Sequence, residues 1–448
     1  MATYVYRTPG STFTGEKYTF SGWFKRGNLD ARNCMLWASS DGGSADFTEI
    51  EFKADGTLHW GNKPSSGTNM QLVTNRVFKD PAAWYHLVFT WDTTLSAGDR
   101  AKIYVNGVEE TSFSTDSNAG SGETGCSLAT SGVEVDIGKQ TGSTNYYYGE
   151  MSHLHLCIGY AYAASDFGEF DSTSGIWKID ADPSVTHGTN GWFLKMEDRT
   201  NLDLDSSANT YTFTTSGTLT ATYDNPSNNF ATWNPLHNTG ATMSNGNTTA
   251  LSTDANFIAG VSTLGVAAGK WYSEFKLNAE GASGESVIGV TALVRPTSAI
   301  AGQTGNFGMR NDNGTIYYTS GGSATTDTSQ HSDFTTSDII GVALDMDLGR
   351  LYFSKNGGWW NGAATWGAAT PSSYITLQTD IYDEFFFEGG DAAGSQDASW
   401  QANFGNGYFG TTAVSSAQAD DAGIGAMEYD VPAGYYCLCT KNIKAYGG

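Results

Sequence analysis

The chain of 448 residues contains only five cysteines, an odd number spread thinly along its length. A disulfide framework needs dense, paired cysteines, so we expect buried, reduced thiols instead. Long apolar runs are also missing: no stretch approaches the roughly 18 residues of a membrane-spanning helix. The first seven residues have no apolar core of the kind that a secretory signal needs. We therefore predict no membrane insertion and no export by a signal peptide.

Basic residues are scarce as well, with 23 Lys and Arg against 47 Asp and Glu, for a formal net charge of -24. So negative a surface argues against nucleic acid and anionic membranes as partners. Glycine is abundant, at 55 residues against 9 prolines, and aromatic residues make up 13% of the chain. This composition is typical of many short strands joined by tight turns.

Apolar and polar residues alternate with period two along most of the chain, which predicts strands. Asn106-Gly107 follows one such strand at once and predicts a hairpin turn. Short helices are expected only near 161–169 and 413–420. The pattern predicts an all-β protein of two tandem antiparallel β-sandwiches. We place the domains at residues 1–222 and 223–448, the second with a C-terminal extension.

Several segments resemble known families in their order and spacing. In the first domain they resemble the laminin-G/pentraxin type of concanavalin-like jelly roll, and in the second a SPRY-like sandwich. The first set is YTFSGWFK at 18–25, WYHLVFTWD at 84–92, IYVNGV at 103–108, IG at 137–138 and YGEM at 148–151. The second set is GKWY at 269–272, IGV at 288–290, DIIGVALD at 338–345, LYFSKNG at 351–357 and NFG at 403–405.

The combination also resembles something narrower. The two domains, with NNFATWNPL at 228–236 between them and PAGYYCLCTKN at 432–442 near the end, resemble virion proteins of tailed bacteriophages, marine and cyanophage-like ones especially. The resemblance implies a virion protein, made in the host cytoplasm, that is structural or contacts the host. Its partners would be other virion proteins.

Concanavalin-like folds also include glycoside hydrolases, which need two carboxyl groups close together. Laminarinase-like families use a Glu-x-Asp-x-x-Glu strand, and Glu134-Val-Asp136 begins this pattern, but Lys139 stands where the second acid belongs. We interpret Glu134 and Asp136 as surface acids. Glu384 and Glu388 are four residues apart, which indicates an exposed strand edge rather than a catalytic pair.

Other motifs in the sequence do not match a phosphate-binding loop or a zinc site. Gly265 to Lys270 is one residue short of a phosphate loop and precedes a strand. His153 and His155 could share a strand face, but further ligands at zinc-site spacing are missing. Cys437 and Cys439 are better explained by a packed strand. We predict no enzyme, no catalytic residues and no metal site.

Two loops do suggest binding. Sugar recognition uses flat aromatic faces together with polar side chains and backbone groups. One loop contains Tyr146, Tyr147 and Tyr148, and the other contains Trp359 and Trp360 with Trp366 nearby. Consecutive aromatic residues in polar turns favour a contact surface, for a glycan or for a neighbouring subunit. The sequence does not separate these two alternatives.

Calcium is a further alternative, because pentraxin-type domains often hold it through oxygen ligands in loops. The acidic loops to inspect are 41–46 and 201–205, although polar turn chemistry accounts for either. We assign no cofactor there.

The leading hypothesis is a non-enzymatic virion protein, exposed on a tail fibre or similar appendage, that contacts host-surface glycans or proteins. The alternative is a capsid decoration or connector protein with a purely structural role, compatible with the lack of a fibre shaft before the first sandwich. A glycan-degrading enzyme stands third. A homo-oligomer, by analogy a trimer, is expected.

Overall fold

The computed structural model describes residues 3–41, 46–64, 67–124, 126–237, 241–252, 260–281, 285–292, 303–391 and 398–447. The chain divides into two compact units, Met1–Ala221 and Thr222–Gly448. The division falls one residue before the boundary expected from sequence. No helix in the described residues is long and apolar enough to cross a membrane.

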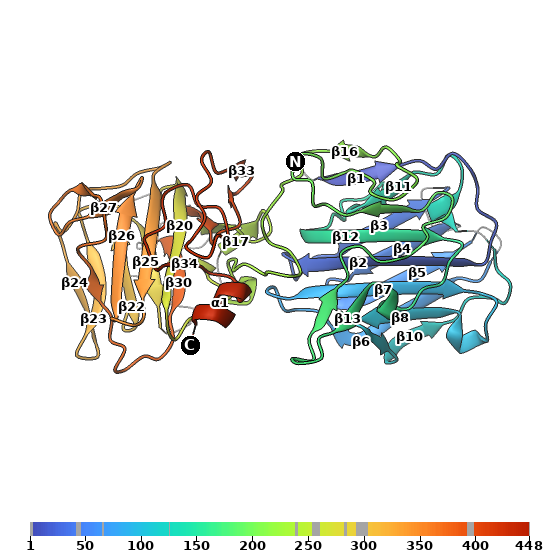
Figure 1. Ribbon diagram of the computed structural model, residues 1–448, viewed down its shortest axis with the longest axis horizontal. Helices are drawn as coiled ribbons and strands as arrows, with labels where there is room; N and C mark the ends of the chain where they lie inside the picture. The colour runs from blue at the N-terminus through green and yellow to red at the C-terminus, as the bar shows by residue number, and fades with distance from the viewer. Residues whose placement is uncertain are drawn as a thin grey trace. The chain divides into compact units, whose positions relative to one another are not determined.

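The first unit is a sandwich of two antiparallel sheets (Figure 1). The eight-stranded sheet has the order β10 (Phe113–Ser117), β6 (Met70–Val77), β5 (Thr57–Lys63), β4 (Phe47–Phe52), β3 (Asn33–Ser39), β11 (Val135–Ile137), β1 (Tyr4–Arg7) and β16 (Thr214–Ser216). The six-stranded sheet has the order β15 (Trp192–Leu194), β12 (Gly149–Ile158), β2 (Lys17–Arg26), β7 (Trp84–Asp92), β8 (Ala101–Val105) and β9 (Val108–Glu110).

The core of this unit lies between the two sheets, where alternate side chains of each strand meet. Leu36, Ile50 and Trp60 belong to it from three neighbouring strands. The predicted hairpin turn is present between β8 and β9, where Asn106 and Gly107 both have positive φ, at 47° and 82°. These are the dihedrals that a two-residue turn between twisted strands needs.

The outer faces of the two sheets differ in what covers them. The outer face of the six-stranded sheet is covered by the segment after β12, which contains the 3-10 helix η3 (Ala164–Asp166) and the hairpin of β13 (Gly168–Phe170) and β14 (Trp177–Ile179). Phe167 of this segment packs on Val88 and Cys157. Trp177 donates its indole N–H to His86 at 3.0 Å. The eight-stranded sheet instead carries polar and aromatic side chains outside, described below.

The second unit is also a two-sheet sandwich. Its ten-stranded sheet has the order β17 (Ala241–Ser244), β18 (Thr249–Ser252), β31 (Ser399–Asn403), β20 (Lys270–Ala279), β25 (Ile339–Asp345), β26 (Arg350–Lys355), β27 (Gly358–Trp360) and β28 (Trp366–Ala368), with β29 (Ile375–Thr376) on β26 and β34 (Tyr436–Cys437) on β20. Its six-stranded sheet has the order β19 (Gly260–Val261), β30 (Phe386–Asp391), β21 (Ser286–Thr291), β22 (Asn306–Arg310), β23 (Ile316–Ser320) and β24 (Ser323–Asp327). A small hairpin, β32 (Tyr408–Phe409) with β33 (Thr412–Ala413), completes the strands.

Three expectations need correction here. Residues 413–420 are not helical, because Gln418 instead bridges to Met427 through paired backbone hydrogen bonds. A helix that was not expected, α1 (Thr440–Tyr446), ends the described chain. The strand β30 is not an exposed edge: it pairs on both sides, and Glu388 is buried and accepts a hydrogen bond from Asn306. Glu384 precedes this strand and is exposed.

Candidate functional site

The three consecutive tyrosines of the first loop take three different positions. Tyr147 packs against the core on Phe24 and donates its hydroxyl to the Lys25 carbonyl at 3.0 Å. Tyr146 is half-buried, and its ring lies 6.4 Å from that of Tyr4. Tyr148 is 44% exposed. The loop therefore offers two of its three rings for contact.

The tryptophans of the second loop lie mostly inside the fold. Trp359 and Trp360 are each 5% exposed, on opposite faces of β27. Trp359 packs near Tyr272, whereas Trp360 belongs to the core between the sheets and donates to the Gln330 carbonyl at 2.9 Å. Trp366 is half-buried and donates to the Ser332 carbonyl. In this conformation neither Trp359 nor Trp360 presents an open ring face.

On the outer face of the eight-stranded sheet, one residue from each of six neighbouring strands forms a line, which we call the outer row. Consecutive members are direct cross-strand partners on β1, β11, β3, β4, β5 and β6, and their sequence neighbours point into the core. The outer row consists of Tyr6, Asp136, Trp37, Glu49, Gly61 and Gln71.

At one end of the outer row, three half-buried tyrosines form what we call the tyrosine cluster: Tyr4, Tyr6 and Tyr146. The ring of Tyr4 lies 5.7 Å from that of Tyr6 and 6.4 Å from that of Tyr146. The ammonium of Lys139 lies 4.2 Å from the Tyr4 ring centre, a cation–π contact. Tyr6 is the cross-strand partner of Asp136. Half-buried aromatic rings thus adjoin a buried carboxyl group on this side of the sheet.

Near the middle of the outer row, four residues form what we call the carboxylate cluster: Arg32, Glu49, Glu51 and His59. Glu49 and Glu51 stand two residues apart on β4 and so share a face. Arg32 contacts Glu49 Oε1 at 3.0 Å and Glu51 Oε2 at 2.7 Å. His59 Nδ1 lies 3.3 Å from Glu51 Oε1 and 3.8 Å from Glu49 Oε2.

In this environment the pKa values of the two carboxyl groups shift in opposite directions. Burial, together with the neighbouring Glu51, raises the pKa of Glu49 to about 7. Burial also opposes the charge on Glu51, but hydrogen bonds from His59 and Arg32 outweigh it and lower the pKa of Glu51. Burial and the nearby Glu134 raise the pKa of Asp136 to about 7. A protonated and an ionised carboxyl group therefore coexist on this face near neutral pH.

The interpretation of Glu134 and Asp136 as surface acids is wrong for Asp136. Glu134 is exposed, as expected, but Asp136 is fully buried at the centre of β11 and accepts a hydrogen bond from Thr141. Its burial follows from its place in the outer row between the rings of Tyr6 and Trp37, its two cross-strand partners.

The sequence contains a signal for the carboxylate cluster outside the glucanase-like pattern at Glu134 and Asp136. Glu49-Ile-Glu51 also places two acids on one face of a strand. The pair lies in a strand flanked by Arg32 before it and His59 after it. Opposite charges on neighbouring strands of a meander are the expected partners of such a pair.

In the described residues of the loop at 201–205, which was considered for calcium, the acidic side chains accept hydrogen bonds from the protein itself. Asp205 accepts hydrogen bonds from the amides of Phe193, Ser207 and Tyr211, at 2.9, 2.9 and 2.8 Å. Asp203 accepts one from Thr215 at 2.7 Å. In the other loop, residues 42–45 lie outside the described residues.

We expect Asp205→Ala to lower the free energy of unfolding of the first unit by about 3 kcal/mol, because it leaves three amide donors without their acceptor. Urea denaturation of the full chain measures this. Asp203→Ala is the control, since it removes one bond and should cost about 1 kcal/mol. Equal effects of the two substitutions would contradict this role for Asp205.

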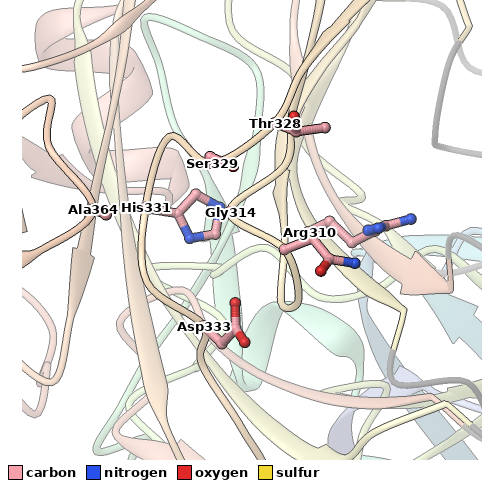
Figure 2. A pocket seen from close by; sticks show the side chains of 8 residues that line it. Arg310, Gly314, Thr328, Ser329, His331, Asp333 and Ala364 are labelled. Atoms are coloured by element: carbon pink, nitrogen blue, oxygen red, sulfur yellow. The ribbon is translucent and has the colours of Figure 1, made fainter.

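The second unit has a polar pocket of about 500 Å³. Figure 2 shows Arg310, His331 and Asp333 among its lining. Arg310 forms ion pairs with Glu285, at 3.2 Å, and with Asp312. His331 contacts the carbonyl oxygens of Ser332 and Thr315 through its two ring nitrogens, at 3.0 and 3.3 Å. The Arg310 guanidinium and the His331 imidazole are thus engaged with the protein itself.

The remaining candidates from sequence have structural roles. All five cysteines are buried and free. Cys437 lies in β34, which pairs in parallel with β20. His153 lies 3.4 Å from Glu197, and His155 stacks on Phe193 with ring centres 3.8 Å apart. Among the described residues, the only three metal-ligand side chains that converge are Glu49, Glu51 and His59.

Comparison with protein families matches residues 2–157 to the concanavalin A-like lectin/glucanase superfamily and residues 270–370 to the SPRY domain. No curated protein matches the chain.

Similar solved structures include the SPRY domain of human HERC1, at 18% identity, covering 36% of this chain and 91% of that chain, with TM-score 0.30. A heptameric SAP-like pentraxin from Limulus polyphemus is 19% identical, covering 36% of this chain and 72% of its own, with TM-score 0.28. A protein from Bacteroides ovatus described as a candidate carbohydrate-binding protein is 16% identical, covering 48% and 58%, with TM-score 0.33. By its family matches and its two sandwiches, the chain is a concanavalin A-like domain followed by a SPRY domain.

Proposed function

We propose that this chain is a non-enzymatic adhesin of a phage particle, which binds glycans or proteins of the host surface through the tyrosine cluster and the adjoining outer row. The observation that carries the proposal is the tyrosine cluster, whose three half-buried rings gather at one end of the outer row. Rings of this kind pack on the C–H face of a sugar, and polar groups beside them bond to its hydroxyls. Tyr148, which is exposed, adds contact area nearby in sequence.

One further point supports binding rather than turnover. The acid pair Glu49 and Glu51 is almost completely buried, and each carboxyl group gives one oxygen to Arg32, which is a poor arrangement for attacking or protonating a polysaccharide. The assignment to a phage particle rests on the sequence resemblance.

The binding site is tested with the full chain on host cells and on immobilised glycans. Tyr6→Ala with Tyr146→Ala should weaken binding at least about tenfold, equivalent to about 1.4 kcal/mol. Tyr374→Ala is the control, because that tyrosine is 39% exposed and belongs to the second unit, outside the proposed site, and it should leave binding unchanged. Unchanged binding by the folded double variant would exclude the tyrosine cluster as the site.

The location is tested separately by cryo-EM of the intact particle. We expect density for the chain on the tail or on distal fibres. Density spread over the capsid lattice would overturn the adhesin and favour a decoration protein, with the tyrosine cluster as a subunit contact. Release of sugars from polysaccharide panels by the purified chain would overturn the non-enzymatic part of the proposal.

A further inference from the structure

The carboxylate cluster has a feature that glycan or protein binding does not explain. Each carboxylate gives one oxygen to Arg32 and turns the other toward His59. One ligand atom from each of Glu49, Glu51 and His59 lies within 4.8 Å of the other two. Both carboxylates are almost completely buried, at 7% and 2% exposed.

We propose that Glu49, Glu51 and His59 form a binding site for one divalent transition-metal ion, with Zn²⁺ the best fit. Zinc bonds to nitrogen and carboxylate oxygen at about 2.0–2.1 Å, so two ligands of a tetrahedral ion stand about 3.3–3.4 Å apart. The distance from His59 Nδ1 to Glu51 Oε1 is 3.3 Å, and the distance to Glu49 Oε2 is 3.8 Å. Three protein ligands leave the fourth position for water or for a bound ligand.

The strands hold these ligands in place before any ion arrives. Glu51 and His59 are direct cross-strand partners on β4 and β5, and Glu49 shares their face. Since Arg32 occupies only the other oxygen of each carboxylate, the His59 side of the pair remains available for an ion. Ligands mounted on paired strands lose little freedom on binding, which favours affinity.

The ligand types of the cluster select among metal ions. Metal binding uses ionised carboxylates and neutral imidazole, so any protons on these groups leave to solvent as the ion enters. The imidazole nitrogen favours zinc and its neighbours over calcium or magnesium, which prefer oxygen ligands.

Calorimetric titration of the metal-free full chain with Zn²⁺, with metal content measured after gel filtration, tests the site. One equivalent should bind, and His59→Gln should weaken the affinity more than about 100-fold, since even outer-shell changes cost 10–100-fold. The circular dichroism spectrum and the melting temperature without metal should match those of the wild type, which shows that the variant is folded.

Two controls address other zinc-binding groups. His187→Gln removes the imidazole that lies 3.2 Å from His155, and should not change the affinity. Glu169→Gln with Asp171→Asn removes an exposed acid pair beside Lys178 and should not change it either. The proposal is overturned if the wild type retains no zinc, if His59→Gln binds as tightly as the wild type, or if Ca²⁺ binds at these residues in preference to Zn²⁺.

Discussion

Replacement of Trp359 and Trp360 together by alanine is expected to remove most of the stability of the second unit. A buried Trp→Ala substitution costs about 3–5 kcal/mol, and a whole domain is stable by only about 5–15 kcal/mol. The two rings lie on opposite faces of β27, so the double substitution opens a void on both sides of the sheet. Loss of the Trp360 indole also leaves the carbonyls of Gln330 and Ala363 without their donor.

Urea denaturation of the full chain, followed by circular dichroism, measures this effect. Trp366→Ala should cost less, because that ring is half-buried at the edge strand β28. Leu348→Ala serves as an exposed control, because that side chain is 56% exposed, and should change the free energy of unfolding by less than about 0.5 kcal/mol. If the double variant unfolded at the wild-type urea concentration, the packing described for β27 would be wrong. Loss of host adsorption by the double variant would report lost folding, so Tyr146 and Tyr148 are better sites for adsorption tests.

The second large effect concerns pH and the buried carboxyl group of Glu274. This residue is fully buried on β20 and accepts hydrogen bonds from the amides of Glu428 and Tyr429, at 2.7 and 2.9 Å. These bonds favour the charged form, but burial outweighs them and raises the pKa of Glu274 to about 7. The folded protein therefore holds a proton at pH values where the unfolded chain has released it.

The sign of the effect follows from this difference. With a folded pKa above the unfolded value of 4.5, the contribution of Glu274 to stability is fully present below pH 4.5 and is lost as the pH rises through 7. A difference of about 2.5 units corresponds to about 3 kcal/mol. We expect the wild type to lose that amount relative to Glu274→Gln between pH 4 and pH 8, because glutamine stays neutral throughout.

Urea denaturation of both proteins at several pH values tests this expectation. Other groups titrate in the same range, including Glu49 and Asp136 in the first unit, but they are common to both proteins and cancel in the difference. Parallel pH profiles for the wild type and Glu274→Gln would show that Glu274 is already ionised in the folded state at pH 5.

Local sequence signals predicted the fold class well. Alternation identified the strands, and Asn-Gly pairs identified hairpins: Asn356 and Gly357 also have positive φ, at 49° and 83°, between β26 and β27. These signals involve residues close in sequence, where geometry leaves few choices. The family comparison then agreed with the concanavalin-like and SPRY-like resemblance.

The candidate site was harder to predict, because burial on a sheet face depends on distant segments. Trp359 and Trp360 occur in a polar, glycine-rich stretch, yet one packs near Tyr272 and the other against the core between the sheets. Tyr146 was expected to make contacts, but its neighbours Tyr4 and Tyr6 come from the first strand of the chain. No local sequence pattern predicts that Tyr146 lies beside Tyr4, because their proximity depends on how β1 pairs with β11.

The residues of the carboxylate cluster lie close together in the sequence, whereas those of the tyrosine cluster do not. Its four residues all lie between Arg32 and His59, on or beside three consecutive strands that pair as a meander. A single exchange of this short stretch between related genes would therefore transfer the whole cluster at once. The tyrosine cluster combines residues from two distant stretches, so recombination would separate its members. The two surfaces can consequently diversify independently of each other during evolution.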